Sequence, residues 1–265
     1  MTRHYTSLWL LLLTAFAIVA AYSCIDPVKV GDTEIKSSGM ADRLTRHVDT
    51  PEEVALKARN DSIAESALTK ETRAETDTAS QNILIIGDSM LEGLNPALAA
   101  YAKKNGHRQN SVIWYSSTTE YWGTCDTLKV YLRQFKPSFI FISLGANELF
   151  VSDIAEKRTD MLKNFLSQIG DIPYVWIGPP NWKKDTGINR MIRDNVKPGC
   201  YFRSDGMTFD REKDGAHPTH ASAVLWMDSI ARWMPLHAAH PIRLDKPDAG
   251  TKARPDKVVV LQPKH

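Results

Sequence analysis

The most informative stretch of this chain is Ile83-Leu84-Ile85-Ile86-Gly87-Asp88-Ser89, in which a short apolar run ends abruptly in a polar turn. Four large aliphatic residues in a row are typical of a strand that is buried on both faces. A serine just past such a strand, and before a helix, is exposed at the carboxyl edge of a sheet, where it can act as a nucleophile. Gly-Asp-Ser also forms ordinary turns and helix caps, so its meaning depends on the segments downstream.

Downstream of Ser89, apolar runs alternate with helical patterns. After the run at 83–86, the pattern predicts further strands at 112–115, 139–144, 174–177 and 201–202. It predicts helices at 91–104, 128–135, 154–169, 188–196 and 217–233. Strands that alternate with helices form a parallel sheet with helices on both faces. We therefore expect an α/β domain over residues 81–237 with about five parallel strands.

Both ends of the chain contain little that could form a core. Residues 24–80 are predicted to be a spacer, partly helical or disordered, with a helix that starts at Thr50-Pro51-Glu52-Glu53 and runs to about Lys70. A partner-binding helix is the less favoured interpretation, because the apolar stripe is weak. Residues 238–265 hold four prolines and mixed charges, so a disordered tail is predicted in preference to a strand at Val258–Leu261.

An apolar stretch from Leu8 to Tyr22 follows Arg3 and His4, and it is short for a membrane span. It fits the apolar region of a signal peptide or membrane anchor, assigned to residues 1–23. Ala21-Tyr22-Ser23-Cys24 resembles the cleavage box of bacterial lipoproteins, in which the cysteine becomes the lipidated N-terminus. Lipidation of Cys24, an uncleaved anchor and simple secretion all export the domain, to the periplasm or cell surface of a bacterium.

Composition narrows the function classes. The 265 residues are 43% hydrophobic and 24% charged with a net charge of +2, which fits one globular domain plus extensions and gives no reason to expect a nucleic-acid partner. Cys125 and Cys200 form a disulfide or remain two free thiols, and the sequence leaves both open. No cysteine pair has metal-ligand spacing, and we expect neither a metal nor a cofactor.

Three loops at the predicted carboxyl edge of the sheet carry polar residues suited to catalysis. Ser89 needs a base within hydrogen-bond reach, and His217 is the candidate. The imidazole needs a carboxylate on its other nitrogen, and Asp214 lies three residues before it. These three residues are therefore the predicted catalytic set. The alternative is that Asp214 caps the last helix and that His217 is a surface histidine.

A serine nucleophile also requires donors for the oxyanion that forms during the reaction. We expect them from the Asn147 side-chain amide and the Ser89 backbone N–H. A third would come from the loop after the second strand, from Ser116 to Gly123. Gly123 lets the backbone approach closely, although Ser117 lies nearer the end of the strand.

With these residues the chain resembles the SGNH (GDSL-type) hydrolase family, over residues 81–235. The likeness is carried by Gly87-Asp88-Ser89, Gly145-x-Asn147-Glu148 and Asp214-x-x-His217. It implies a flavodoxin-like three-layer α/β/α sandwich and the roles given above to Ser89, His217, Asp214, Asn147 and Gly123. Glu148 departs from the family's usual aspartate, and the glycine after the second strand is poorly matched.

Candidate substrate-binding residues lie on two loops at the same edge. Trp182, with Tyr121 and Trp122, could stack on sugar rings, although ordinary loop packing is the alternative for each. The cations Lys183, Lys184, Arg190 and Arg193 could meet an anionic polymer or simply form a solvated face. We expect an exported esterase that removes acetyl or other short acyl groups from a polysaccharide. The alternatives are a lysophospholipase or thioesterase, an acyltransferase, and a non-catalytic envelope module; the oligomeric state stays open.

Overall fold

The computed structural model describes residues 28–30, 33–35 and 74–263, and the chain divides into two units at residues 66 and 67. In the first unit, β1 (Val28–Val30) and β2 (Thr33–Ile35) form an antiparallel hairpin that the sequence did not predict. The apolar stretch at 8–22, Cys24 and the predicted helix at 51–70 lie outside the described residues. Among the residues that are described, no helix has the length and apolar character needed to cross a membrane.

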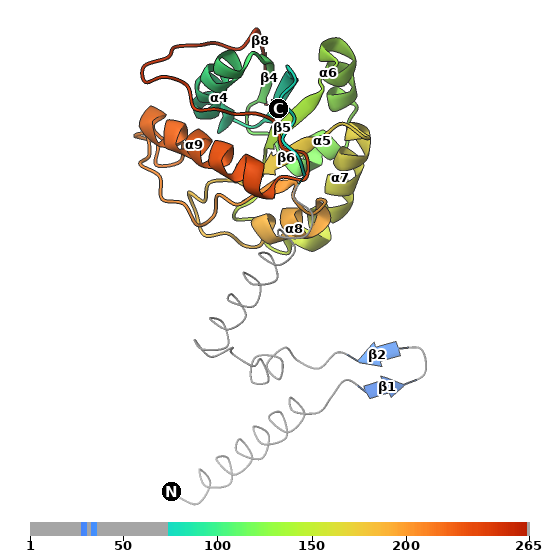
Figure 1. Cartoon of the computed structure of the whole chain (residues 1–265). Coiled ribbons are helices and arrows are strands. Elements are labelled where there is room, and N and C mark those ends of the chain that lie inside the picture. Colours follow the sequence, from blue (N-terminus) through green and yellow to red (C-terminus); the bar gives the residue numbers. More distant parts are fainter. Residues whose placement is uncertain (1–27, 31–32, 36–73, 264–265) are drawn as a thin grey trace, which may run out of the picture. The chain divides into compact units, whose positions relative to one another are not determined.

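The second unit is built around a parallel six-stranded sheet, whose strand order is β7-β6-β5-β3-β4-β8 (Figure 1). The strands are β3 (Asn82–Gly87), β4 (Arg108–Trp114), β5 (Phe139–Ser143), β6 (Tyr174–Ile177), β7 (Tyr201–Phe202) and β8 (Lys257–Leu261). Numbered along the chain, the five predicted strands lie in the order 2-1-3-4-5, which is the flavodoxin-like arrangement. The predicted parallel sheet is confirmed, with one strand more than expected.

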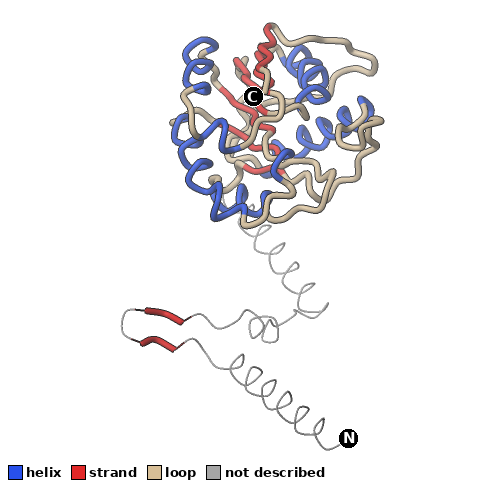
Figure 2. Tube along the Cα trace, turned by 180° about the vertical axis from the view of Figure 1, so that it is seen from behind, coloured by secondary structure: helices blue, strands red, loops and turns tan. Residues whose placement is uncertain are grey.

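Helices cover both faces of this sheet, as Figures 1 and 2 show. They are α4 (Leu91–Asn105), α5 (Thr119–Gly123), α6 (Thr127–Phe135), α7 (Ile154–Ile169), α8 (Ile188–Asn195) and α9 (His220–His237). Side chains of α4 and α9 share one core with Ile83 and Ile85, whereas those of α5 to α8 share the other with Leu84 and Ile86. The alternation along β3 is what a strand covered on both faces requires. The three-layer α/β/α architecture is thereby confirmed.

The segment after α9 corrects the predicted disordered tail. Ile242 and Leu244 are buried, and Asp77 pairs with Ile242 in an isolated bridge, so the ordered domain also begins before residue 81. The chain then returns to the sheet, where β8 pairs parallel with β4. As an edge strand, β8 leaves Val258 and Val260 exposed.

The two described cysteines are free thiols, so the disulfide alternative is wrong. Cys200 is buried, and burial raises the pKa of its thiol to about 11. The Cys125 thiol is half-buried and donates to the backbone carbonyl of Tyr121 at 3.0 Å. Both cysteines therefore act as small packing residues.

Candidate active site

Ser89 lies at the start of α4, immediately after the carboxyl end of β3. Gly87 lies opposite Ser143 on the neighbouring strand β5, and a Cβ on Gly87 would come within 1.8 Å of the Ser143 carbonyl oxygen. Only glycine fits there. The Ser89 carbonyl accepts from the backbone N–H of Glu92, which fixes the serine in the turn that leads into the helix. Its side chain is half-buried and faces the edge of the sheet at which the strand order reverses.

His217 lies on a short hairpin before α9, and not inside that helix as the sequence predicted. Thr219 is the helix N-cap, its side chain accepting from Ser222 N–H, so the helix begins at His220. The backbone of His217 accepts from Glu212 N–H at 2.8 Å, and Thr219 N–H donates to Asp210 at 2.8 Å. These two bonds hold the imidazole on a fixed piece of backbone.

Ser89, His217 and Asp214 form a continuous hydrogen-bonded chain. Ser89 Oγ lies 2.8 Å from His217 Nε2, and His217 Nδ1 lies 2.6 Å from Asp214 Oδ2. The other carboxylate oxygen, Oδ1, accepts from the backbone N–H groups of Ala216 and His217. The hydrogen bond from His217 and these two N–H groups lower the pKa of Asp214 to about 2. The carboxylate is therefore ionised at neutral pH, and it sets the imidazole tautomer that leaves Nε2 free to take the serine proton.

Asp88 is a buried carboxyl that joins the serine turn to the loop after β5. Its Oδ1 accepts from Met90 N–H at 3.0 Å, and its Oδ2 accepts from Ala146 N–H at 3.3 Å. Burial raises the pKa of Asp88 to about 7, and the nearby Glu148 carboxyl contributes in the same direction. Asp88 belongs to the turn-forming sequence Gly-Asp-Ser, and its bond from Met90 lies within that turn. The structure gives Asp88 the further task of holding two loops of the site together.

Asn147 lies on a single 3₁₀ turn, Ala146–Glu148, directly after the Asp88 contact. Its Nδ2 donates one hydrogen to the carbonyl of Ser117 at 3.0 Å. An amide nitrogen carries two hydrogens, so this bond orients the group and leaves the second hydrogen for a ligand. The loop after β4 thus meets the site at Ser117, the residue nearer the strand end.

Glu148 is fully buried and clamps the loop after β4. One oxygen accepts from Thr119 N–H at 2.8 Å, the other from the Thr119 hydroxyl at 2.9 Å, and Arg158 Nε donates to it at 3.2 Å. The sequence noted Glu148 only as a departure from an aspartate. The longer side chain reaches the first N–H of α5. In the sequence, the pair Thr118-Thr119 marks the start of this helix, where a carboxylate is stabilised by free backbone N–H groups.

Gly123 does not line the site, which corrects the prediction for this residue. It is the last residue of α5, and a Cβ there would come within 2.1 Å of the Met161 carbonyl oxygen on α7. The glycine allows two helices to approach closely on the far side of α5. Its place after the second strand suggested a donor, but eight residues separate it from Trp114 at the strand end, and the last four of them belong to α5.

Trp122 is also misassigned as a substrate-binding residue. Its indole is fully buried, donates to the Ser117 hydroxyl at 3.0 Å, and packs edge-on against Trp114 and Phe165. Tyr121 is half-buried and lies against Trp114, with 5.6 Å between ring centroids. Both aromatic residues therefore support the loop from within the domain.

Trp182 lies where the sequence placed it, on a loop beside the catalytic residues. Its Nε1 donates to the Ala146 carbonyl at 2.9 Å, next to Asn147. The exposed ring of Phe150 lies 6.4 Å from it, and the Lys183 ammonium lies 4.6 Å from the Trp182 ring and 5.3 Å from that of Phe150. The other predicted cations, Lys184, Arg190 and Arg193, are exposed, and Arg193 pairs with Asp194.

Arg211 connects the Trp182 loop to the histidine hairpin, and the sequence analysis missed it. Its guanidinium donates to the carbonyls of Ala216 and of Asn181, the latter at 3.0 Å. Ala216 precedes His217, and Asn181 precedes Trp182, so one side chain spaces the two loops. A single arginine among many gives no sequence signal for such a role.

No family model and no curated protein matches the sequence. The chain is similar to solved structures of GDSL-type esterases. One is the psychrotrophic esterase EstA from Pseudoalteromonas sp., inhibited by monoethylphosphonate, with 16% identity, a TM-score of 0.41, and coverage of 56% of this chain and 94% of that one. Another is a protein described as a lipolytic protein of the G-D-S-L family from Desulfitobacterium hafniense DCB-2. It has 14% sequence identity and a TM-score of 0.42, and the match covers 57% of this chain and 97% of that one.

Proposed function

We propose that the protein is an exported serine hydrolase that removes acetyl or other short acyl groups from a carbohydrate through an acyl-enzyme on Ser89. The observation that carries the proposal is the chain of contacts from Ser89 Oγ to His217 Nε2, at 2.8 Å, and from His217 Nδ1 to Asp214, at 2.6 Å. A serine, an imidazole and an ionised carboxylate in this order are the arrangement that activates a hydroxyl for acyl transfer.

The chemistry follows from these positions. Ser89 Oγ attacks the ester carbonyl carbon while its proton moves to His217 Nε2, and the carbonyl oxygen becomes an oxyanion. The ester C–O bond then breaks, and the proton on Nε2 goes to the departing alcohol. Water enters, gives its proton to His217 and attacks the acyl carbon, so that the carboxylic acid leaves and Ser89 regains its proton. The free hydrogen of Asn147 Nδ2 and the Ser89 N–H are the proposed oxyanion donors.

The surroundings of the triad favour a short acyl group on a sugar. The side chains of His217 and Asp214 are 32% and 50% exposed, so a bulky polymer can approach the serine. In the described loops around the site, at 116–118, 145–150, 178–187 and 203–219, no run of large apolar residues exists to hold a long acyl chain. Trp182 and Phe150 offer aromatic surface for a sugar ring, and Lys183 beside them favours an anionic polymer.

Export remains part of the proposal and rests on the sequence. The apolar stretch at 8–22 and Cys24 support a lipid-anchored enzyme in the bacterial envelope. Radiolabelled palmitate should be incorporated into the wild-type protein and not into a Cys24→Ala variant. Equal labelling of the two proteins would reject the proposed lipid anchor at Cys24.

The catalytic part is tested by labelling with a fluorophosphonate probe, which reacts with activated serines. Wild type should be labelled, Ser89→Ala should not, and Ser167→Ala, which removes an exposed hydroxyl on α7, should be labelled like wild type. Labelling that survives in Ser89→Ala, or no labelling of folded wild type, would overturn the catalytic assignment.

The substrate part needs a separate measurement. Wild type should release acetate from at least one acetylated glycan, such as acetylated xylan, pectin or chitin oligosaccharides, and should act poorly on lysophosphatidylcholine. Rapid hydrolysis of the lysophospholipid without release of acetate from any of these glycans would reject the assignment as a carbohydrate esterase. The assignment as a serine hydrolase would then still hold.

A further inference from the structure

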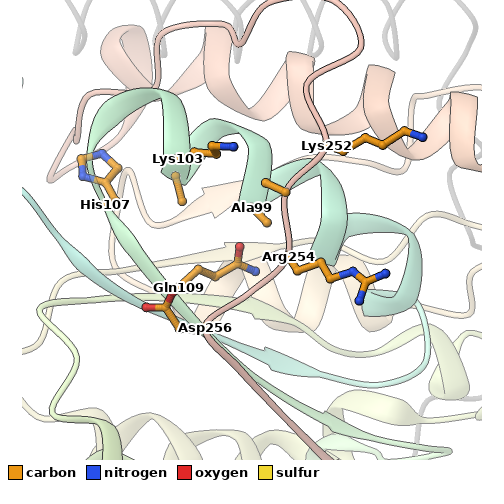
Figure 3. A pocket seen from close by; sticks show the side chains of 9 residues that line it. Ala99, Lys103, His107, Gln109, Lys252, Arg254 and Asp256 are labelled. Atoms are coloured by element: carbon orange, nitrogen blue, oxygen red, sulfur yellow. The ribbon is translucent and has the colours of Figure 1, made fainter.

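A cavity of about 600 Å³ lies between α4 and the chain segment 252–256, away from the triad (Figure 3). Gln109, which lines it, is the second residue of β4, whereas Ser89 follows the carboxyl end of the adjacent parallel strand β3. The cavity is therefore at the amino edge of the sheet and the triad at the carboxyl edge. Its volume is in the range of sites for small organic ligands.

Three cations line this cavity from two sides. Lys103 comes from the last turn of α4, and Lys252 and Arg254 come from the segment opposite. None of the three takes part in an ion pair within residues 74–263, although the neighbouring Lys104 pairs with Asp248. The carboxylate that lines the cavity, Asp256, is engaged by Arg108 at 3.2 Å. Unpaired cations around a concave surface favour an anionic ligand.

A buried acceptor at the same place lacks a donor. The Gln109 side chain is 2% exposed, and its Nε2 donates to Asn95 Oδ1 at 3.2 Å, but its Oε1 is buried and has no hydrogen-bond partner. Figure 3 shows the carboxamide pointing toward the space between α4 and residues 252–256. Such an oxygen is unfavourable in a folded protein unless something donates to it. A hydroxyl group of a ligand meets that need.

The remaining lining excludes other classes of ligand. Ala99, Ala102 and Ala253 form its apolar part, so it has neither a large aliphatic surface for an acyl chain nor an aromatic face to stack a base. The ring of His107 is already committed, since Nδ1 accepts from Gln81 N–H and Nε2 lies 2.7 Å from the Arg243 carbonyl. The ligand must combine an anionic group with hydroxyl donors on a compact frame.

We propose that this cavity is a second binding site, for an acidic saccharide, meaning a sugar that carries a carboxylate or a phosphate. The anionic group would lie among Lys103, Lys252 and Arg254, and a hydroxyl would donate to Gln109 Oε1. The site is independent of the triad and of the proposed esterase reaction.

Isothermal titration calorimetry of the full chain at low ionic strength tests this, with glucuronate, glucose 6-phosphate, glucose and inorganic phosphate as probes. The two acidic sugars should bind, and glucose should bind about tenfold more weakly or not at all, because it lacks the charge. Lys252→Gln should weaken the binding of both acidic sugars by about tenfold. Lys163→Gln, which removes an exposed lysine on α7, should leave their binding unchanged.

Gln109→Leu separates a sugar site from a simple anion site. This variant should weaken the binding of the acidic sugars and leave the binding of inorganic phosphate unchanged. The rate of ester hydrolysis by Gln109→Leu and by Lys252→Gln should stay at the wild-type value, because neither substitution touches Ser89, His217 or Asp214. If Gln109→Leu fails to fold, the exposed Lys252→Gln still decides the charge requirement. The proposal is wrong if no probe binds, if phosphate alone binds, or if Lys163→Gln weakens binding as much as Lys252→Gln.

Discussion

Replacing Asp88 by asparagine should change how the stability of the protein depends on pH. Asp88 is buried, and burial raises its pKa from 3.8 to about 7. A carboxyl whose pKa is higher in the folded than in the unfolded chain stabilises the fold fully below the unfolded pKa. That contribution is lost as the pH rises through the folded pKa. The difference between 3.8 and about 7 corresponds to about 4 kcal/mol, since each pKa unit is worth about 1.4 kcal/mol.

The Asp88→Asn variant lacks this titration. Its amide oxygen can still accept from Met90 N–H, but its NH₂ group opposes Ala146 N–H, at a roughly constant cost of about 1–3 kcal/mol. The free energy of unfolding of wild type relative to the variant should therefore fall by roughly 2–3 kcal/mol between pH 5 and pH 8. Urea denaturation of both proteins at several pH values measures this difference.

A second buried aspartate serves as the control. Burial opposes the ionisation of Asp228, but hydrogen bonds from Lys246 and Tyr101 outweigh it and lower its pKa. Asp228→Asn should therefore change stability by an amount that stays constant between pH 5 and pH 8. A constant difference for Asp88→Asn as well would mean that burial does not raise the pKa of Asp88 in the folded protein.

Three further predictions concern the site and the last strand. Asn147→Ala should lower kcat about 10²–10³-fold with little change in KM, as loss of one oxyanion donor does; a wild-type kcat would remove Asn147 from that role. Asp214→Asn should lower kcat by up to about 10⁴-fold by allowing the wrong imidazole tautomer, and Asp194→Asn, on the surface of α8, should not. Deleting residues 257–265 removes the β8 ladder and should lower the free energy of unfolding by several kcal/mol at about 1 kcal/mol per backbone hydrogen bond, measured by urea denaturation.

The triad could be predicted because each of its residues has a local signature. Ser89 follows a strand of four aliphatic residues, and the spacing of Asp214 and His217 allows one turn to join them. Each of these signals lies within a short stretch of chain, so contacts between distant segments are not needed to recognise it. The alternation of strand and helix predicted the parallel sheet, whereas the flavodoxin-like arrangement of its five predicted strands was implied by the resemblance to the SGNH hydrolase family.

The errors arose where the outcome depends on contacts between distant segments. Gly123 and Trp122 follow the second strand closely, but the intervening helix α5 turns both toward α7. The strand at Lys257–Leu261 depends on its pairing with β4, which the prolines and charges of the surrounding segment 238–265 do not reveal. Arg211 acts through two backbone carbonyls that lie on different loops. Such roles depend on tertiary structure and leave no periodic pattern in the sequence.

We propose that Ser89 carries the acyl group during turnover, and acid-quenching the protein during hydrolysis of p-nitrophenyl acetate traps that intermediate. Peptide mass spectrometry of the quenched sample should find one acetyl group on the peptide that contains Ser89, together with a burst of p-nitrophenol equal to the enzyme concentration. Steady hydrolysis with no acetyl group on Ser89, or unchanged hydrolysis by Ser89→Ala, would rule out an acyl-enzyme on this serine.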